Sequence, residues 1–82
     1  MTKQNNIFEL YDKLNKSGAR RDACKFIADL VGVKPSSVKA HWIFHREIPD
    51  YVTDNQLDEI IKYLQNAIFL QNEAIKNIEV VR

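Results

Sequence analysis

The sequence predicts an all-α fold made of three short helices followed by a long C-terminal helix. Apolar residues recur every three or four positions along most of the chain, which is the spacing of one helix face. The 82 residues include only two glycines and two prolines, so little of the chain can be turn or linker. No run shows the apolar–polar alternation of a half-buried strand. The length and the 45% hydrophobic content together indicate one globular domain.

The first helix is expected over about residues 7–16. Asn6 can cap this helix, and Glu9, three positions later, would complete a capping box. Ser17-Gly18 then interrupts the helical pattern. The apolar stripe that predicts the helix consists of Ile7, Leu10, Tyr11 and Leu14.

A second helix is expected over about residues 19–31, and a third over about residues 36–45. Gly32 follows the second helix directly, and glycine commonly ends a helix because it adopts the left-handed conformation without strain. Pro35 suits the first turn of the third helix, where its missing N–H would be unpaired anyway. Residues 33–35 alone separate the two helices, which indicates a sharp turn.

The fourth helix is expected from about residue 54 to about residue 78. Pro49 separates it from the third helix, and Thr53 with Gln56 has the spacing of a capping box at its start. Along this helix a set of positions alternates by four and three residues, as in the heptads of a coiled coil. We call this set the heptad seam; it consists of Leu57, Ile61, Leu64, Ile68, Gln71, Ile75 and Ile78.

The heptad seam is the predicted interface of a homodimer, in which Gln71 would fix the register at some cost in stability. An alternative stays open at this point. The seam could instead simply pack against the first three helices of the same chain, because a chain of 82 residues needs that core. We expect the long helix to serve both purposes, core packing and dimerisation.

The segment from Ile27 to Val38 has the residue spacing of a helix-turn-helix motif. Ala28 is small where the following helix would cross it, and Gly32 turns the chain. Val33 and Val38 are apolar where the turn and the third helix would rest on the core. The sequence therefore predicts a compact helix-turn-helix domain, with residues 1–52 as the DNA-binding region and residues 53–82 as the long helix.

This spacing resembles the helix-turn-helix of the phage Cro/repressor-like DNA-binding regulators. The resemblance covers about residues 19–65 and continues past the motif with an aromatic residue, a basic stretch and an Ile-Pro pair. Here these features are Trp42, His45-Arg46 and Ile48-Pro49. Two positions depart from the family pattern. Cys24-Lys25 stands where many relatives have a phosphate-contacting glutamine or threonine, and Trp42 lies one residue later than the usual aromatic position.

The resemblance implies a phage or mobile-element regulator, repressor-like, that inserts its third helix into the major groove of double-stranded DNA. Lysine, serine and small apolar side chains can contact base edges. The candidate base contacts are Lys34, Ser36, Ser37, Lys39, Ala40 and Ile43. Cations around the motif would contact phosphates and give salt-dependent affinity. The candidate phosphate contacts are Arg20, Arg21, Lys25 and Arg46.

The charges of the chain are unevenly distributed. Residues 1–48 carry nine Lys/Arg and five Asp/Glu, a net charge of +4, whereas residues 49–82 carry three and six, a net charge of −3. A basic front and an acidic back would orient the protein on a polyanion.

Two other functions remain open from the sequence. The third helix carries no Arg, Asn or Gln, the best readers of base edges, so the scaffold could serve protein binding instead, as in an antirepressor or a host-takeover factor. An architectural or replication-associated DNA binder would have the same motif with little sequence preference.

Catalysis and metal binding are not expected. His41 and His45 have a spacing that can hold zinc, but no third ligand accompanies them. Cys24 lies within an amphipathic helix, which indicates a small semi-buried residue rather than a nucleophile. We therefore expect no enzyme activity, no cofactor and no small-molecule substrate.

The sequence also predicts a cytoplasmic protein without a membrane partner. No apolar run approaches the roughly 20 residues that span a bilayer, and the polar N-terminus lacks a signal-peptide core. The single cysteine cannot form an intrachain disulfide.

Overall fold

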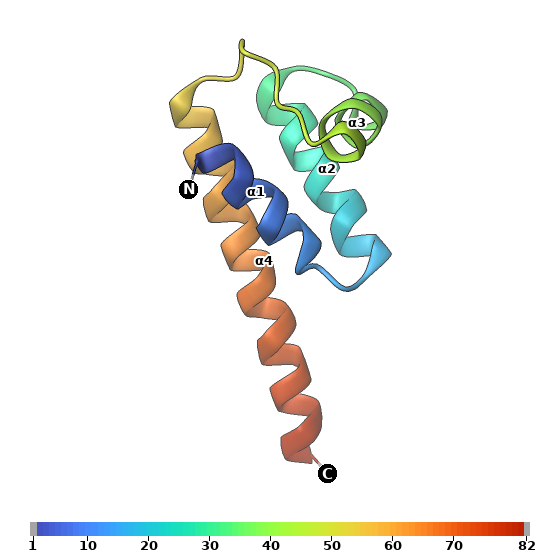
Figure 1. The fold of residues 1–82 in the computed structure, drawn as a ribbon. Helices are drawn as coiled ribbons and strands as arrows, with labels where there is room; N and C mark the ends of the chain where they lie inside the picture. The colour runs from blue at the N-terminus through green and yellow to red at the C-terminus, as the bar shows by residue number, and fades with distance from the viewer. Residues whose placement is uncertain (1, 82) are drawn as a thin grey trace.

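The all-α prediction is confirmed by the computed structural model, which describes the backbone of residues 2–81 and the side chains of residues 2–73 (Figure 1). Within that range the elements are α1 (Lys3–Asp12), α2 (Ser17–Val31), α3 (Pro35–Ser37), the π-helix η1 (Val38–Ile43) and α4 (Asp54–Val81). The chain runs from α3 through η1 into a last α-helical turn without interruption. We call this continuous helix, residues 35–45, the α3–η1 helix.

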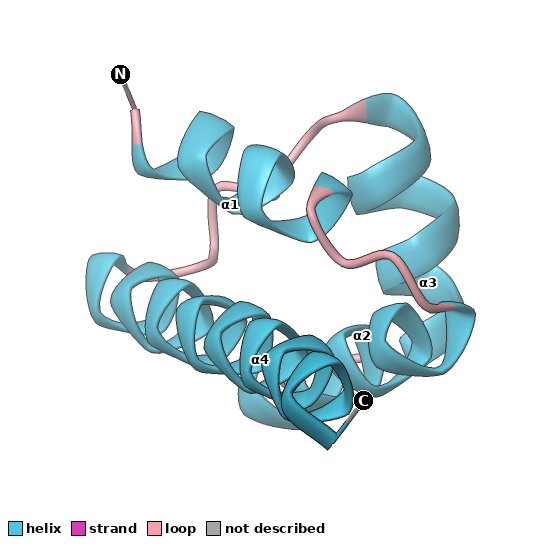
Figure 2. Ribbon diagram, turned by 90° about the horizontal axis from the view of Figure 1, so that it is seen from below, coloured by secondary structure: helices cyan, strands magenta, loops and turns pink. Residues whose placement is uncertain are grey.

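Helix α2 lies between α4 and the α3–η1 helix. It packs against α4 on one side and against the α3–η1 helix on the other, while α1 packs along α4. Phe26 of α2 stacks on Tyr63 of α4 with ring centroids 4.2 Å apart. The α3–η1 helix therefore lies on the side of the molecule away from α4, as Figures 1 and 2 both show.

A single hydrophobic core joins these elements. The helices α1, α2, η1 and α4 and the connections before α2 and α4 contribute buried apolar side chains to one cluster. Burial of each large side chain stabilises the fold by about 1.5–3 kcal/mol relative to exposure. The buried residues are Ile7, Phe8, Tyr11, Leu14, Ala23, Cys24, Ile27, Ala28, Val38, Trp42, Ile48, Val52, Leu57, Ile60 and Leu64.

Helix α1 begins and ends four residues earlier than the sequence predicts. Its cap is Thr2, whose Oγ1 accepts a hydrogen bond from the Asn5 N–H at 3.2 Å. The predicted capping box is wrong because Asn6 and Glu9 lie inside the helix. The chain leaves the helix after Asp12, although Leu14 beyond it is fully buried.

The turn between α2 and the α3–η1 helix is the one the sequence predicts. Gly32 has a φ of 85°, in the left-handed region, and its N–H donates to the Ala28 carbonyl at 2.8 Å. The Val33 N–H donates to the same carbonyl at 3.0 Å. Pro35 occupies the first turn of α3, and α2 begins at Ser17, two residues before its predicted start.

The middle of the α3–η1 helix has π geometry, in which N–H groups donate to carbonyls five residues back. The Phe44 N–H donates to the Lys39 carbonyl, and the Glu47 N–H to the Trp42 carbonyl at 3.0 Å. A π turn accommodates one residue more than an α turn. Val38 and Trp42, both within this π turn, are buried in the core.

Helix α4 begins with the predicted capping box. The Thr53 N–H donates to Gln56 Oε1 at 2.9 Å, and the Gln56 N–H donates to Thr53 Oγ1 at 3.2 Å. The helix then continues to Val81 and extends well past α1 and α2 (Figure 1). Among residues 2–81, no helix has the length and apolar content needed to cross a bilayer.

The left-handed conformation at Gly32 yields the first prediction. Gly32→Ala should lower the free energy of unfolding by about 1 kcal/mol, because an alanine is strained at positive φ. Urea unfolding followed by circular dichroism measures this change.

Gly18→Ala is the matched control, since a Cβ at either glycine would meet no atom within 4 Å and only Gly32 has a positive φ. Alanine at position 18 should leave stability unchanged or raise it by up to about 1 kcal/mol. Equal losses in the two variants would show that the turn does not depend on the left-handed conformation.

Candidate nucleic-acid interface

A groove with a volume of about 780 Å³ lies between the start of α2 and the α3–η1 helix. Three cations line it, Arg20 and Arg21 from α2 and Lys39 from η1, and none of its lining residues is acidic. Hydroxyl groups of Ser17 and Ser36 add hydrogen-bonding capacity at its rim. The groove is therefore a cationic depression bordered by both helices of the motif.

The floor of the groove is uncharged. Tyr11 and Cys24 are both buried there, with the Tyr11 hydroxyl 3.8 Å from the Cys24 Sγ. Burial, helped by this contact, raises the pKa of Tyr11 to about 12, so the phenol stays neutral at physiological pH. Cys24 is 4% exposed, in agreement with the structural role expected for it.

The outer face of the α3–η1 helix presents most of the predicted base contacts. Ser36, Lys39 and Ala40 are exposed, and Lys34 is exposed just before the helix begins. The remaining two predicted base contacts, Ser37 and Ile43, are half-buried and so less accessible. Ile43 packs against the core instead of facing outward.

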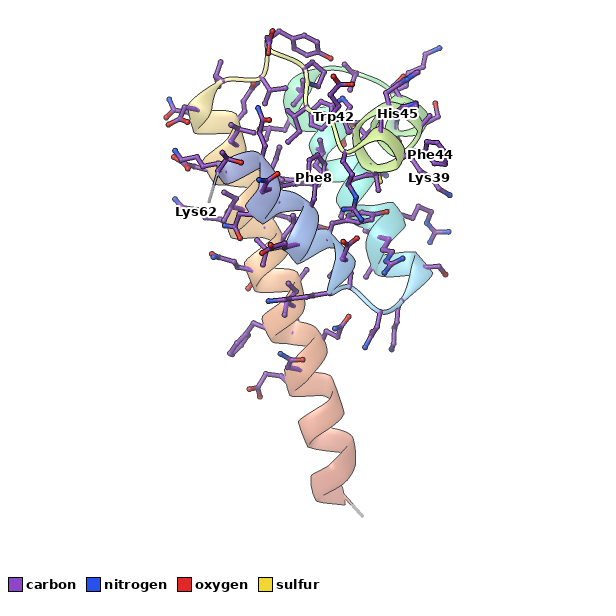
Figure 3. All side chains as sticks on the ribbon, in the orientation of Figure 1. Phe8, Lys39, Trp42, Phe44, His45 and Lys62 are labelled. Atoms are coloured by element: carbon purple, nitrogen blue, oxygen red, sulfur yellow. The ribbon has the colours of Figure 1, made fainter. Side chains whose placement is uncertain are left out.

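The sequence analysis missed Phe44, whose side chain is 80% exposed. Its ring meets the His45 ring edge-on with centroids 5.2 Å apart, and His45 stacks on His41 at 6.3 Å. Phe44 and Lys39 both point outward from the helix, whereas Trp42 points toward the core (Figure 3). The signal was present in the sequence, because a residue two positions after a core residue lies on the opposite face of a helix.

Arg20, predicted as a phosphate contact, is occupied within the fold. Its Nε donates to the Leu14 carbonyl at 2.7 Å and its Nη2 to the Asp12 carbonyl at 3.3 Å. The guanidinium also lies 5.6 Å from the centroid of the Tyr11 ring. Arg20 therefore satisfies the carbonyl of Asp12, the last residue of α1, and that of Leu14, two residues beyond it.

Arg46, also predicted as a phosphate contact, likewise makes contacts within the fold. Its Nη2 lies 2.9 and 2.8 Å from the two carboxylate oxygens of Asp12, and its Nη1 donates to the Phe8 carbonyl at 3.4 Å. The guanidinium also lies 5.5 Å from the centroid of the Phe8 ring. Arg46 thus ties the end of the α3–η1 helix to α1 through an exposed ion pair, and its role on phosphate stays a prediction.

The other cations around the motif are exposed and unpaired in the part of the chain whose side chains are described. Arg21 and Lys25 lie one turn apart on α2, and Lys34 and Lys39 lie at and within the α3–η1 helix. No salt bridge joins any of these four to a described carboxylate. They form a cationic surface that spans both helices, and we call these four residues the motif cations.

The heptad seam packs mainly on its own chain. Leu57 and Leu64 are buried in the core, and Ile61 and Ile68 are half-buried against it. At these positions α4 packs on the helices of its own chain, the alternative that the sequence left open. Leu57 and Leu64 are buried and so cannot contact a partner, while the homodimer stays a prediction for the other seam positions.

Gln71 also serves its own chain, because its Oε1 accepts from the Asn15 N–H at 3.1 Å and its Nε2 donates to the Lys13 carbonyl at 3.2 Å. It thereby ties α4 to the connection between α1 and α2. The side chains of Ile75 and Ile78, the last two seam positions, lie outside the described residues.

Comparison of the chain with protein-family models, curated proteins and solved structures gave no match. Within residues 2–73, no three His, Cys, Asp or Glu side chains lie close enough together to hold a metal ion.

Proposed function

We propose that this protein is a sequence-specific DNA-binding transcriptional regulator that inserts the α3–η1 helix into the major groove. The observation that carries the proposal is the exposed outer face of this helix, flanked by the motif cations. Residues 32–46 contain Lys34, Lys39 and Arg46 but no Asp or Glu, so no carboxylate of this segment would oppose phosphate. The major groove of B-DNA is about 12 Å wide and admits a single helix.

The fold supports this docking because the inner and outer faces of the helix differ completely. Val38 and Trp42 anchor the inner face in the core, so the helix is held rigidly on the scaffold. Lys39 and Ala40 then point away from the protein and can reach base edges. Lysine donates to the acceptors of guanine, and a small apolar side chain fits beside a thymine methyl.

Phosphate contacts in this proposal come mainly from α2. Arg21 and Lys25 are exposed on one face of that helix, and Arg21 borders the groove shared with Lys39. The Lys16 side chain makes no capping hydrogen bond at the start of α2, which leaves backbone N–H groups there to face a phosphate.

A protein-interaction module on the same scaffold is the second candidate function. The 80% exposure of Phe44 favours it, because large exposed apolar side chains often mark protein-binding surfaces. Under that function, removal of the motif cations would leave activity intact.

DNA binding should depend on Lys39 far more than on a lysine elsewhere. Lys39→Ala should weaken binding to duplex DNA by about tenfold and reduce the slope of log K against log salt by about 1. Fluorescence anisotropy with a labelled random-sequence duplex at several salt concentrations measures both quantities.

Lys62→Ala is the matched control, since Lys62 is an exposed lysine on α4, away from the α3–η1 helix (Figure 3). It should change affinity by less than about twofold. Equal effects of the two variants, or no salt-sensitive binding by the unmodified protein at micromolar concentration, would contradict the proposal.

We extend the proposal to two copies joined by the projecting end of α4. Phe69 and Leu70 lie on this part of the helix and are 59% and 58% exposed, although apolar side chains of this size favour burial. A pair would place two α3–η1 helices on half-sites about 34 Å apart.

Multi-angle light scattering tests this extension. The unmodified protein should have twice the 9.6 kDa mass of one chain, and joint replacement of Phe69 and Leu70 by lysine should give single chains. Replacement of the exposed Gln65 and Asn66 by lysine, on the same helix, is the matched control and should leave the pair intact. A mass of 9.6 kDa for the unmodified protein at every concentration, with and without DNA, would rule the pair out.

A further inference from the structure

We propose that Phe44 contacts the 5-methyl group of a thymine in the DNA site and so contributes to its sequence preference. This inference rests on the proposed DNA-binding function and deepens it, because it assigns a base to a residue on the helix. It starts from the exposure of the phenyl ring, which at 80% is the highest among the exposed large apolar side chains of the described residues.

The position of Phe44 places its ring beside the candidate base-contacting lysine. The Phe44 N–H donates to the Lys39 carbonyl, so the two residues lie one π turn apart on the same helix. Both side chains point outward in Figure 3, on the face opposite Trp42. A helix that brings Lys39 to the base edges therefore brings the phenyl ring of Phe44 to them as well.

The ring is also supported on the protein side. His45 meets it edge-on at 5.2 Å, and His41 stacks on His45 at 6.3 Å. Such aromatic contacts favour particular orientations of the ring. A ring held in place in this way loses less conformational freedom when it contacts a ligand.

Charge decides between the ligands that an exposed phenyl ring could meet. Lys39 lies one π turn away on the same face, and residues 32–46 contain no Asp or Glu, the nearest acidic residue along the chain being Glu47. These surroundings match a polyanion. The thymine methyl is the apolar group that base edges present in the major groove, and Phe is among the side chains that contact it. Lysine prefers guanine acceptors, so we expect thymine and guanine close together in the same half-site.

The test uses a duplex obtained by binding-site selection with the unmodified protein. Each thymine is replaced in turn by deoxyuridine, which lacks only the methyl group. At one position in each half-site this replacement should lower the affinity of the unmodified protein about fourfold, because one methyl group is no longer buried against the protein. Phe44→Ala should bind the thymine duplex about tenfold more weakly and should be indifferent to deoxyuridine at that position.

Tyr51→Ala provides the matched control, because Tyr51 is an exposed aromatic residue in the segment before α4 that is placed neither on DNA nor in the contact between two copies. It should keep the fourfold sensitivity of the unmodified protein. Circular dichroism of Phe44→Ala should show an intact fold, since the side chain contributes nothing to the core.

The outcomes separate this inference from the proposed function. Salt-sensitive binding that requires Lys39 but is indifferent to deoxyuridine at every position would overturn the thymine contact alone. The thymine contact would also be overturned if Phe44→Ala kept the deoxyuridine sensitivity of the unmodified protein. It would be overturned as well if Phe44→Ala kept full affinity for DNA, as expected of a residue that binds a protein instead. Absence of any DNA binding would overturn the proposed function first.

Discussion

The burial of Val38 and Trp42 beneath the α3–η1 helix is the constraint on which the arrangement of the interface depends. The helix meets the remainder of the protein chiefly through α2 and the core, on the side away from α4. These two side chains are 0% and 2% exposed and hold its inner face in place. The outer face is then left to solvent, with Lys39 and Phe44 directed away from the scaffold. Insertion into the major groove requires this arrangement, in which one face of the helix is buried in the core and the opposite face is exposed.

Local features of the fold followed directly from the sequence. Gly32, Pro35 and the Thr53–Gln56 capping box act through backbone conformation or hydrogen bonds to near neighbours, so their effects can be read from a few consecutive residues. The start of α1 was mispredicted because Thr2 and Asn6 are both good caps and only the first is used. The π turn has no comparable signature in a few consecutive residues; Val38 and Trp42 are its buried residues.

The candidate site was predictable only in part, for a related reason. Sequence identifies cations near a motif but not the partners that tertiary contacts bring to them. Asp12 lies 34 positions from Arg46 in the chain, yet its carboxylate pairs with that guanidinium. Arg20 likewise meets carbonyls at the end of α1. Arg21 and Lys39, by contrast, form no salt bridge with a described carboxylate.

The central claim is that the outer face of the α3–η1 helix is the surface that meets DNA. The most direct measurement is an NMR titration of ¹⁵N-labelled protein with duplex DNA, read from the change in each backbone amide signal. We expect the largest changes at Ser36, Lys39, Ala40 and Phe44, with smaller ones at the start of α2 and little change around Lys62 on α4. Changes concentrated on α4, or no change on the α3–η1 helix at saturating DNA, would contradict the account.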